Sequence, residues 1–249
     1  MQILLAALSL ALVLGCHHSS IPDLPLVEMA PMHVGAPVAV VVSGDGGWRA
    51  IDRDIANGLH KRGYGVVGLN SREYFAKRRS PQEAAAAFRE IIDHYSRVWG
   101  AKTVVAVGYS RGAGVLPFMI NRLPMPERSQ VSLVALIGLD RTIDFYVTPF
   151  DLVRSAPTEV EIPVRPEVER LRAEVLCIYG TGDENNLCRE LRNVVQVPER
   201  GGHHMNIAYD ALARLIWSAA AMPPLPRQLT AYSSAVRIAR IPRGIARIH

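Results

Sequence analysis

A chain of 249 residues, of which 49% are hydrophobic and 20% charged, has the length and composition of one globular domain with a well-buried core. Its formal net charge of +5 is unevenly spread, because residues 225–249 hold five arginines and no acid and leave the remainder formally neutral. This distribution argues against a nucleic-acid groove in the body of the protein. It predicts a basic tail that is either disordered or in contact with anionic lipid.

The N-terminus has the pattern of a targeting segment. The apolar run from Ile3 to Leu14 is too short to span a bilayer, which takes about 20 residues, but has the length of a signal-peptide core. It ends in Val-Leu-Gly-Cys at Cys16, which resembles a bacterial lipobox, in which the cysteine is lipidated and becomes the mature N-terminus. We therefore expect residues 1–16 to be a lipoprotein-type signal peptide, with export and a membrane anchor at Cys16. Ordinary secretory cleavage with an incidental Cys16 is the alternative.

From residue 36 onward, short buried strands alternate with helices. Apolar, β-branched runs bounded by turn residues predict strands in residues 36–43, 64–71, 102–110, 132–140, 173–186 and 193–199. Amphipathic segments predict helices in residues 44–63, 80–100, 111–123 and 206–222. In the helix predicted for residues 80–100, Ser80 has the residue type of an N-cap and Pro81 that of a first helical residue. The alternation indicates an α/β domain over residues 25–224, with a mostly parallel sheet covered by helices on both faces.

One long irregular segment, residues 141–166, interrupts this alternation between the fourth and fifth predicted strands. It is rich in proline and mixed charge, and long loops of this kind are often functional. We expect it to form a small cap-like insertion on the substrate side.

Two cysteines, Cys177 and Cys188, remain after removal of the signal peptide and lie eleven positions apart. In an oxidising periplasm such a pair can form a disulfide, which would pin the loop that carries Asp183. Two unrelated buried thiols are the alternative.

The stretch Gly108-Tyr109-Ser110-Arg111-Gly112 lies between a predicted strand and a predicted helix. Gly-x-Ser-x-Gly in this context predicts a nucleophile elbow, a tight turn that exposes a serine above a helix N-terminus. Ser110 is therefore the candidate nucleophile.

A nucleophilic serine needs a base, and the base needs an acid to orient it. In proteins with this elbow the chain order is serine, acid, histidine. Asp183 follows the fifth predicted strand, and the pair His203 and His204 follows the sixth. Gly202 makes His203 the preferred base, with His204 as the alternative. Two other carboxylates compete with Asp183 as the acid, namely those of Asp140 and Glu184.

The developing oxyanion needs two hydrogen-bond donors. We expect the backbone N–H of Arg111 to be one of them, and that of Gly44 or Asp45, in the glycine-rich loop after the first strand, to be the other. Asp45, Trp48 and Tyr109 are the residues expected to contact the substrate.

Three motifs together carry a family resemblance: "VSGDGGW", "GYSRGAGVLPF" and "LCIYGTGDENNLC…VPERGGHHMN". In this order they resemble the bacterial virulence protein VirJ/AcvB family over residues 36–222. The resemblance implies an α/β-hydrolase fold and a periplasmic serine hydrolase that releases lysine from lysyl-phosphatidylglycerol. By position it implies Ser110 as nucleophile, Asp183 as acid and His203 or His204 as base. It also implies a link to virulence and type IV secretion.

The expected reaction uses no metal and no cofactor, and the expected partners are the aminoacylated phospholipid, the membrane surface and type IV secretion components, with no nucleic acid. A cationic aminoacyl group calls for a nearby carboxylate, for which Asp45, Asp144 and Asp151 are candidates. Two other functions stay open. One is a general carboxylesterase or lipase of the same fold, and the other is a non-catalytic periplasmic scaffold for a secretion system.

Overall fold

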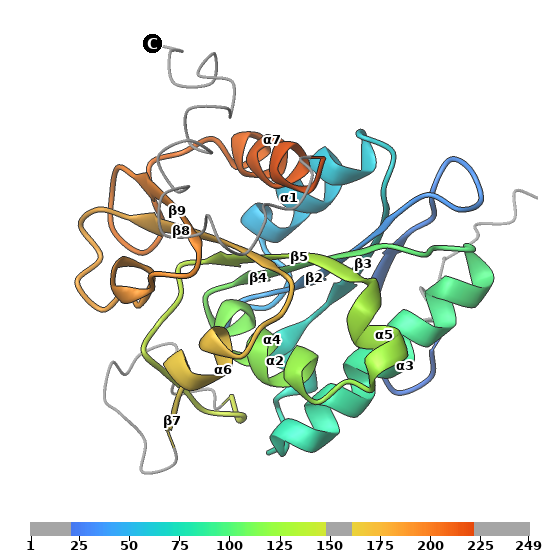
Figure 1. Ribbon diagram of the computed structural model, residues 1–249, viewed down its shortest axis with the longest axis horizontal. Coiled ribbons are helices and arrows are strands. Elements are labelled where there is room, and N and C mark those ends of the chain that lie inside the picture. The colour runs from blue at the N-terminus through green and yellow to red at the C-terminus, as the bar shows by residue number, and fades with distance from the viewer. Residues whose placement is uncertain (1–20, 148–160, 222–249) are drawn as a thin grey trace, which may run out of the picture.

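The computed structural model describes residues 21–147 and 161–221. Within them, seven strands form one twisted sheet in the order β1-β3-β2-β4-β5-β8-β9 (Figure 1). All neighbouring strands are parallel except β1, which runs antiparallel to β3 at one edge. The strands are β1 Leu26–Met29, β2 Val38–Val42, β3 Gly65–Leu69, β4 Val104–Tyr109, β5 Val131–Ile137, β8 Glu174–Gly180 and β9 Val195–Glu199.

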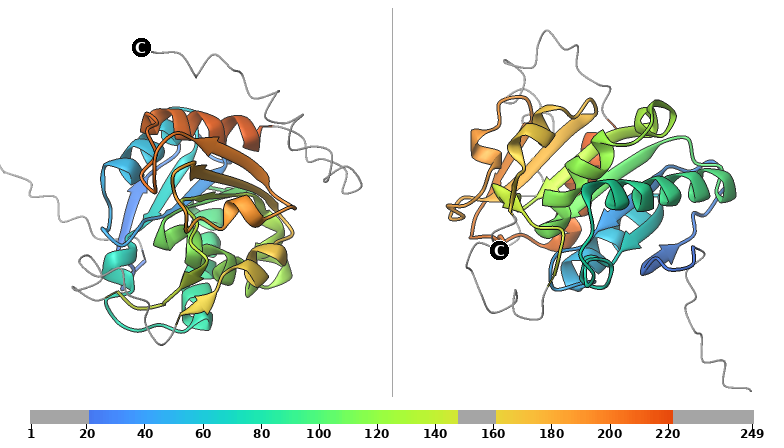
Figure 2. Two further views of the ribbon diagram at one scale, coloured as in Figure 1. Left: turned by 90° about the vertical axis from the view of Figure 1, so that its left-hand side faces the viewer. Right: turned by 90° about the horizontal axis from the view of Figure 1, so that it is seen from below.

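Helices cover both faces of the sheet, as the sequence predicts. One face carries α1 (Ala50–His60) and α7 (Tyr209–Ala220), which pack against each other. The opposite face carries α2 Ser71–Tyr74, α3 Pro81–Val98, α4 Arg111–Asn121, α5 Met125–Gln130 and α6 Arg165–Glu169. Seen from below in Figure 2, α3 runs along this face. At the start of α3, Ser80 Oγ accepts a hydrogen bond from the Glu83 N–H at 3.2 Å.

The central strands are buried on both sides, which is why their sequences read as continuous apolar runs. In β2 the side chains of Val38, Val40 and Val42 join the core beneath α3 and α4. Those of Ala39 and Val41 join the second core, beneath α1 and α7. This two-sided burial confirms the predicted α/β class.

Several short elements escape the sequence patterns. β1 has only four residues, all partly buried, and α5 is only six residues long. The two ends of the predicted insertion pair as an antiparallel two-stranded sheet, β6 (Thr142–Ile143) with β7 (Ile162–Pro163), so this segment leaves the main sheet and returns beside its own start.

Some predictions concern residues outside the described ranges. These are the signal peptide with Cys16, Asp151 in the insertion and the basic tail from residue 225. Among the helices of the described residues, none has the length and apolar character that crossing a membrane requires.

Candidate active site

Ser110 occupies the turn between β4 and α4 with φ +52° and ψ −116°, a conformation that is strained for a residue with a side chain. Two glycines make this turn possible. A Cβ on Gly112 would lie 2.0 Å from the carbonyl oxygen of Val42, and one on Gly108 would lie 2.5 Å from the Gly112 backbone. The turn that carries Ser110 therefore packs closely against β2, and only glycine fits at positions 108 and 112.

Ser110, His203 and Asp183 form a hydrogen-bonded chain. His203 Nε2 lies 2.9 Å from Ser110 Oγ, and His203 Nδ1 lies 3.1 Å from Asp183 Oδ2. Because a carboxylate only accepts, Nδ1 carries the proton in the neutral imidazole and Nε2 accepts from the serine hydroxyl. Each residue follows the carboxyl end of a strand, respectively β4, β9 and β8, and these ends share one edge of the sheet.

His203 and His204 point to different partners. The imidazole of His203 lies over Gly138, whose φ of +62° and lack of a side chain leave room for the ring. His204 instead makes a hydrogen bond through Nδ1 with the Tyr109 hydroxyl, at 2.6 Å. Burial raises the pKa of Tyr109 far above its usual value, so the hydroxyl keeps its proton at neutral pH. The structure thus brings His203, and not His204, to the candidate nucleophile.

The glycine-rich loop after β2 lies directly beside the serine. A Cβ on Gly44 would lie 3.2 Å from the Tyr109 ring and 3.3 Å from Ser110 Cβ. Gly47 N–H donates to Gly44 C=O at 3.0 Å, which closes the loop into a tight turn. Arg111 is the first residue of α4, where backbone N–H groups have no acceptor within the helix. Both predicted sources of oxyanion donors therefore adjoin Ser110, while the choice between Gly44 and Asp45 stays a prediction.

The side chain of Arg111 has a structural connection that the sequence did not reveal. It is 9% exposed, and its Nε donates to the Asp45 carboxylate while a terminal nitrogen donates to the Asp144 carbonyl. The Asp144 carboxylate in turn pairs with Arg78 at 3.1 Å. The two described carboxylates that we considered for a substrate ammonium therefore already bind arginines of the protein.

Asp140 places a second carboxylate beside the histidine. An oxygen of Asp140, an oxygen of Asp183 and a ring nitrogen of His203 all lie within 4.8 Å of one another. Burial raises the pKa of Asp140, His203 opposes this shift, and the carboxylates of Asp183, Asp45 and Glu161 add to it. Glu184, the other competing acid, is exposed and binds Arg141 through its backbone carbonyl. The hydrogen bond to His203 thus belongs to Asp183, with Asp140 as a near neighbour.

Cys177 and Cys188 form a disulfide, which confirms that prediction. Cys177 is on β8, and Cys188 begins the 3₁₀ helix Cys188–Glu190. The bond therefore closes the loop that carries Asp183. Leu187 N–H also donates to the Leu139 carbonyl at 2.8 Å, which ties this loop to the segment that ends in Asp140.

Trp48 packs against the core. Its indole lies over Gly68 of β3, where a Cβ would come within 2.2 Å of the ring, and it joins the apolar cluster beneath α1 and α7. Tyr109 is 7% exposed and belongs to the same cluster. These contacts give both rings a packing role, and their contact with a substrate stays a prediction.

Three solved structures share the fold but are distant in sequence. Est1E from Butyrivibrio proteoclasticus, with ferulic acid bound, has a TM-score of 0.58 at 11% identity, over 79% of this chain and 93% of that chain. An esterase from Pyrococcus furiosus has a TM-score of 0.56 at 13% identity, with 79% and 90% covered. A predicted CIB-like hydrolase from Thermoplasma acidophilum has a TM-score of 0.52 at 16% identity, with 79% and 92% covered.

At these identities the similarity establishes the α/β-hydrolase fold alone. No curated protein matches the chain in sequence. The family model described as bacterial virulence protein (VirJ) matches residues 36–222, which include the elbow, the glycine-rich loop and both loops of the hydrogen-bonded chain. The protein therefore belongs to the bacterial virulence protein (VirJ) family.

Proposed function

We propose that this protein is a serine ester hydrolase in which Ser110 is the nucleophile, His203 the general base and Asp183 the acid that orients it. The observation that carries the proposal is the hydrogen-bonded chain from Ser110 Oγ through His203 to Asp183 at a strained strand-to-helix turn. The glycine-rich loop beside Ser110 and the start of α4 supply backbone donors for an oxyanion.

In the proposed reaction, Ser110 Oγ attacks the ester carbonyl while His203 Nε2 takes the serine proton. The tetrahedral oxyanion is bound by the N–H of Arg111 and by an N–H of Gly44 or Asp45. Collapse breaks the ester bond, and His203 gives its proton to the leaving alcohol. Water then attacks the acyl-enzyme with His203 as base, which releases the acid and restores Ser110.

We further propose that the ester is the aminoacyl ester of lysyl-phosphatidylglycerol, so that the products are lysine and phosphatidylglycerol. The family resemblance implies this substrate, and the match to the VirJ family covers the three motifs that carry the resemblance. Negative charge beside the base supports it too, because an oxygen of Asp140 and an oxygen of Asp183 lie within 4.8 Å of a ring nitrogen of His203, while Asp45 is already paired with Arg111. A cationic aminoacyl group is attracted to such a field, and a simple fatty acyl group is not.

We also propose that the protein acts on the periplasmic surface of a membrane, anchored through a lipid on Cys16. A role in virulence and type IV secretion would then follow from a change in lipid charge. Disulfide formation between Cys177 and Cys188 fits an oxidising compartment.

The test is release of free lysine from purified lysyl-phosphatidylglycerol in mixed micelles. Wild-type protein should release lysine, Ser110→Ala and His203→Ala should lower the rate by at least 10³-fold, and His204→Ala should keep most of it. Circular dichroism of each variant controls for folding.

Other outcomes would favour other functions. A folded wild type that labels with a fluorophosphonate probe and cleaves p-nitrophenyl acyl esters, but releases no lysine, would indicate a general carboxylesterase. A protein that neither labels nor cleaves, and whose Ser110→Ala variant keeps full biological function, would indicate a scaffold.

A further inference from the structure

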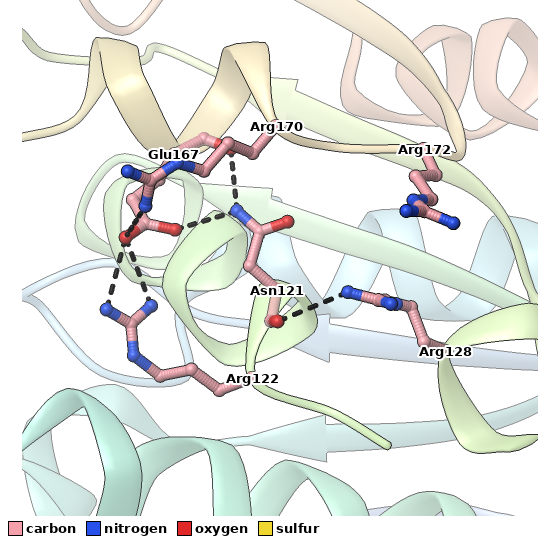
Figure 3. Close-up of a pocket in the computed structure, with 6 residues that line it drawn as sticks. All are labelled: Asn121, Arg122, Arg128, Glu167, Arg170 and Arg172. Carbon is pink, nitrogen blue, oxygen red and sulfur yellow. Dashed lines mark hydrogen bonds and ion pairs between the residues drawn. The ribbon is translucent and has the colours of Figure 1, made fainter. Parts of the chain in front are cut away.

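A basic cavity of about 430 Å³ lies at the edge of the sheet opposite the candidate active site (Figure 3). Its lining residues come from the end of α4, from α5, from α6 and from the turn before β8, and so gather where the parallel strands begin. They are Asn121, Arg122, Arg128, Glu167, Arg170 and Arg172. Because α4 starts beside Ser110 and its 11 residues extend for about 16 Å, the cavity and the serine lie at opposite ends of this helix.

On one side of the cavity, Glu167 is fully engaged by the protein. Its carboxylate, which is 7% exposed, accepts from two nitrogens of Arg122 at 3.1 Å each and from Arg170 at 3.5 Å. Its other oxygen accepts from the Asn121 amide at 2.7 Å. One negative charge is therefore shared between two guanidinium groups, which leaves this side of the cavity positive.

On the other side, Arg128 and Arg172 have no carboxylate partner among the described residues. Arg128 donates to the Asn121 carbonyl at 3.4 Å and to the Met125 sulfur at 2.8 Å, and its buried Nε lacks a hydrogen-bond acceptor there. Arg172 makes neither a hydrogen bond nor an ion pair within 21–147 and 161–221. Figure 3 shows both guanidinium groups on the side of the cavity away from Glu167.

Four guanidinium groups thus surround one concavity that contains one carboxylate. Like charges held together in a concave site repel one another, and an anion bound between them would relieve that repulsion. Guanidinium forks match the oxygens of phosphate with two parallel hydrogen bonds, and a tetrahedral phosphate can meet several forks at once. We propose that this cavity is a binding site for a phosphate-bearing anion, separate from the proposed hydrolytic site.

A phosphate group can come from a soluble phosphate or from a phospholipid headgroup, and the experiment has an arm for each. Inorganic phosphate and glycerol 3-phosphate are titrated into the full mature chain by calorimetry at low ionic strength. In the second arm, the protein is sedimented with vesicles of phosphatidylglycerol, with phosphatidylcholine vesicles as the reference. Binding in the first arm identifies a soluble phosphate, and binding in the second arm alone identifies a headgroup.

The variants test whether the cavity is responsible. Arg128→Gln/Arg172→Gln should weaken binding at least tenfold in whichever arm detects it, and Arg172→Lys, which keeps the charge but loses the fork, should weaken it less. Arg214→Gln is the control, because it removes a partly exposed arginine from α7 on the opposite face and should leave binding unchanged. Arg172→Gln alone has no described hydrogen bond to lose, so its unfolding midpoint should equal that of the wild type.

The proposal is overturned if the wild type binds in neither arm, if the double variant binds as well as the wild type, or if Arg214→Gln weakens binding as much as the double variant does. The outcome is independent of lysine release. Ser110→Ala should bind phosphate as the wild type does, even where it abolishes hydrolysis.

Discussion

The guanidinium of Arg111 and the carboxylate of Asp45 form an ion pair that links the residue after the candidate nucleophile to the glycine-rich loop after β2. Arg111 also holds the Asp144 carbonyl at the base of the insertion. One largely buried side chain thus fixes three segments around Ser110. In the proposed reaction, these segments carry both oxyanion donors, so the side chain of Arg111 acts as a positioning group.

Arg111→Gln should therefore lower kcat about 10- to 100-fold with little change in KM, because the oxyanion donors lose their fixed geometry. The backbone N–H of residue 111 is unchanged in this variant. Steady-state rates of lysine release measure the effect. In a double-mutant cycle, Asp45→Asn should add little to Arg111→Gln, since both remove the same pair. Additive effects would contradict the pairing, and Arg78→Gln, which leaves Asp45 untouched, is the control.

Asp45→Asn should lower the rates on lysyl and alanyl phosphatidylglycerol by the same factor, because this carboxylate is engaged by Arg111. Parallel assays of the two lipids give the ratio. A selective loss of the lysyl activity would instead show that Asp45 recognises the lysine side chain.

Asp140→Asn should lower kcat about tenfold, because it removes a carboxylate whose oxygen lies within 4.8 Å of the His203 ring and which stabilises the imidazolium formed during the reaction. Steady-state rates of lysine release measure the effect. Asp183→Asn should lower kcat further, by about 10³- to 10⁴-fold, because it disrupts the hydrogen bond that the Asp183 carboxylate accepts from His203 Nδ1. The reverse order of the two losses would make Asp140 the orienting acid.

Replacing Cys177 and Cys188 together by alanine should lower the free energy of unfolding by about 3 kcal/mol, the value expected for closing a loop of this length. Because the loop carries Asp183, kcat should fall as well. Urea denaturation and lysine release measure the two effects. Treatment of the wild type with a reductant should reproduce both, and reductant should leave the double variant unchanged.

Asp52 should make stability depend on pH. Burial raises its pKa from 3.8 to about 6, so the folded state holds this proton more tightly than the unfolded state. Its contribution is present below about pH 4 and is lost as the pH rises through about 6, a change of up to ~3 kcal/mol. Asp52→Asn, which mimics the neutral acid, should match the wild type at pH 3.5 and exceed its stability at pH 7.5. Asp54→Asn, at an exposed position of α1, should show no such crossover.

Much of the site could be predicted because its residues follow strand ends, and strand ends are readable from apolar runs. Ser110, Asp183 and the histidine pair were identified in this way. Gly202 favoured His203 over His204 but left His204 open, since adjacent side chains point in different directions and only the folded loop shows that His203 faces Ser110.

Other features depend on contacts between distant segments. Arg111 and Asp45 are 66 positions apart in the sequence, and the basic cavity is lined by residues from three helices and a turn. Local sequence patterns do not predict contacts between residues so far apart in the chain. Short elements such as β1 and β6 offer too few residues for a periodic signal and are held by the strands they meet.

The direction of β1 determines where an N-terminal anchor would hold the protein. Because β1 is antiparallel, Leu26 pairs with Leu69 and Pro25 C=O accepts from Asn70 N–H, both at the sheet edge that carries Ser110. Ile21 is already buried in the core, and the five residue-to-residue steps from Cys16 to Ile21 span at most about 18 Å. A lipid on Cys16 would therefore keep the sheet edge that carries Ser110 close to the bilayer surface.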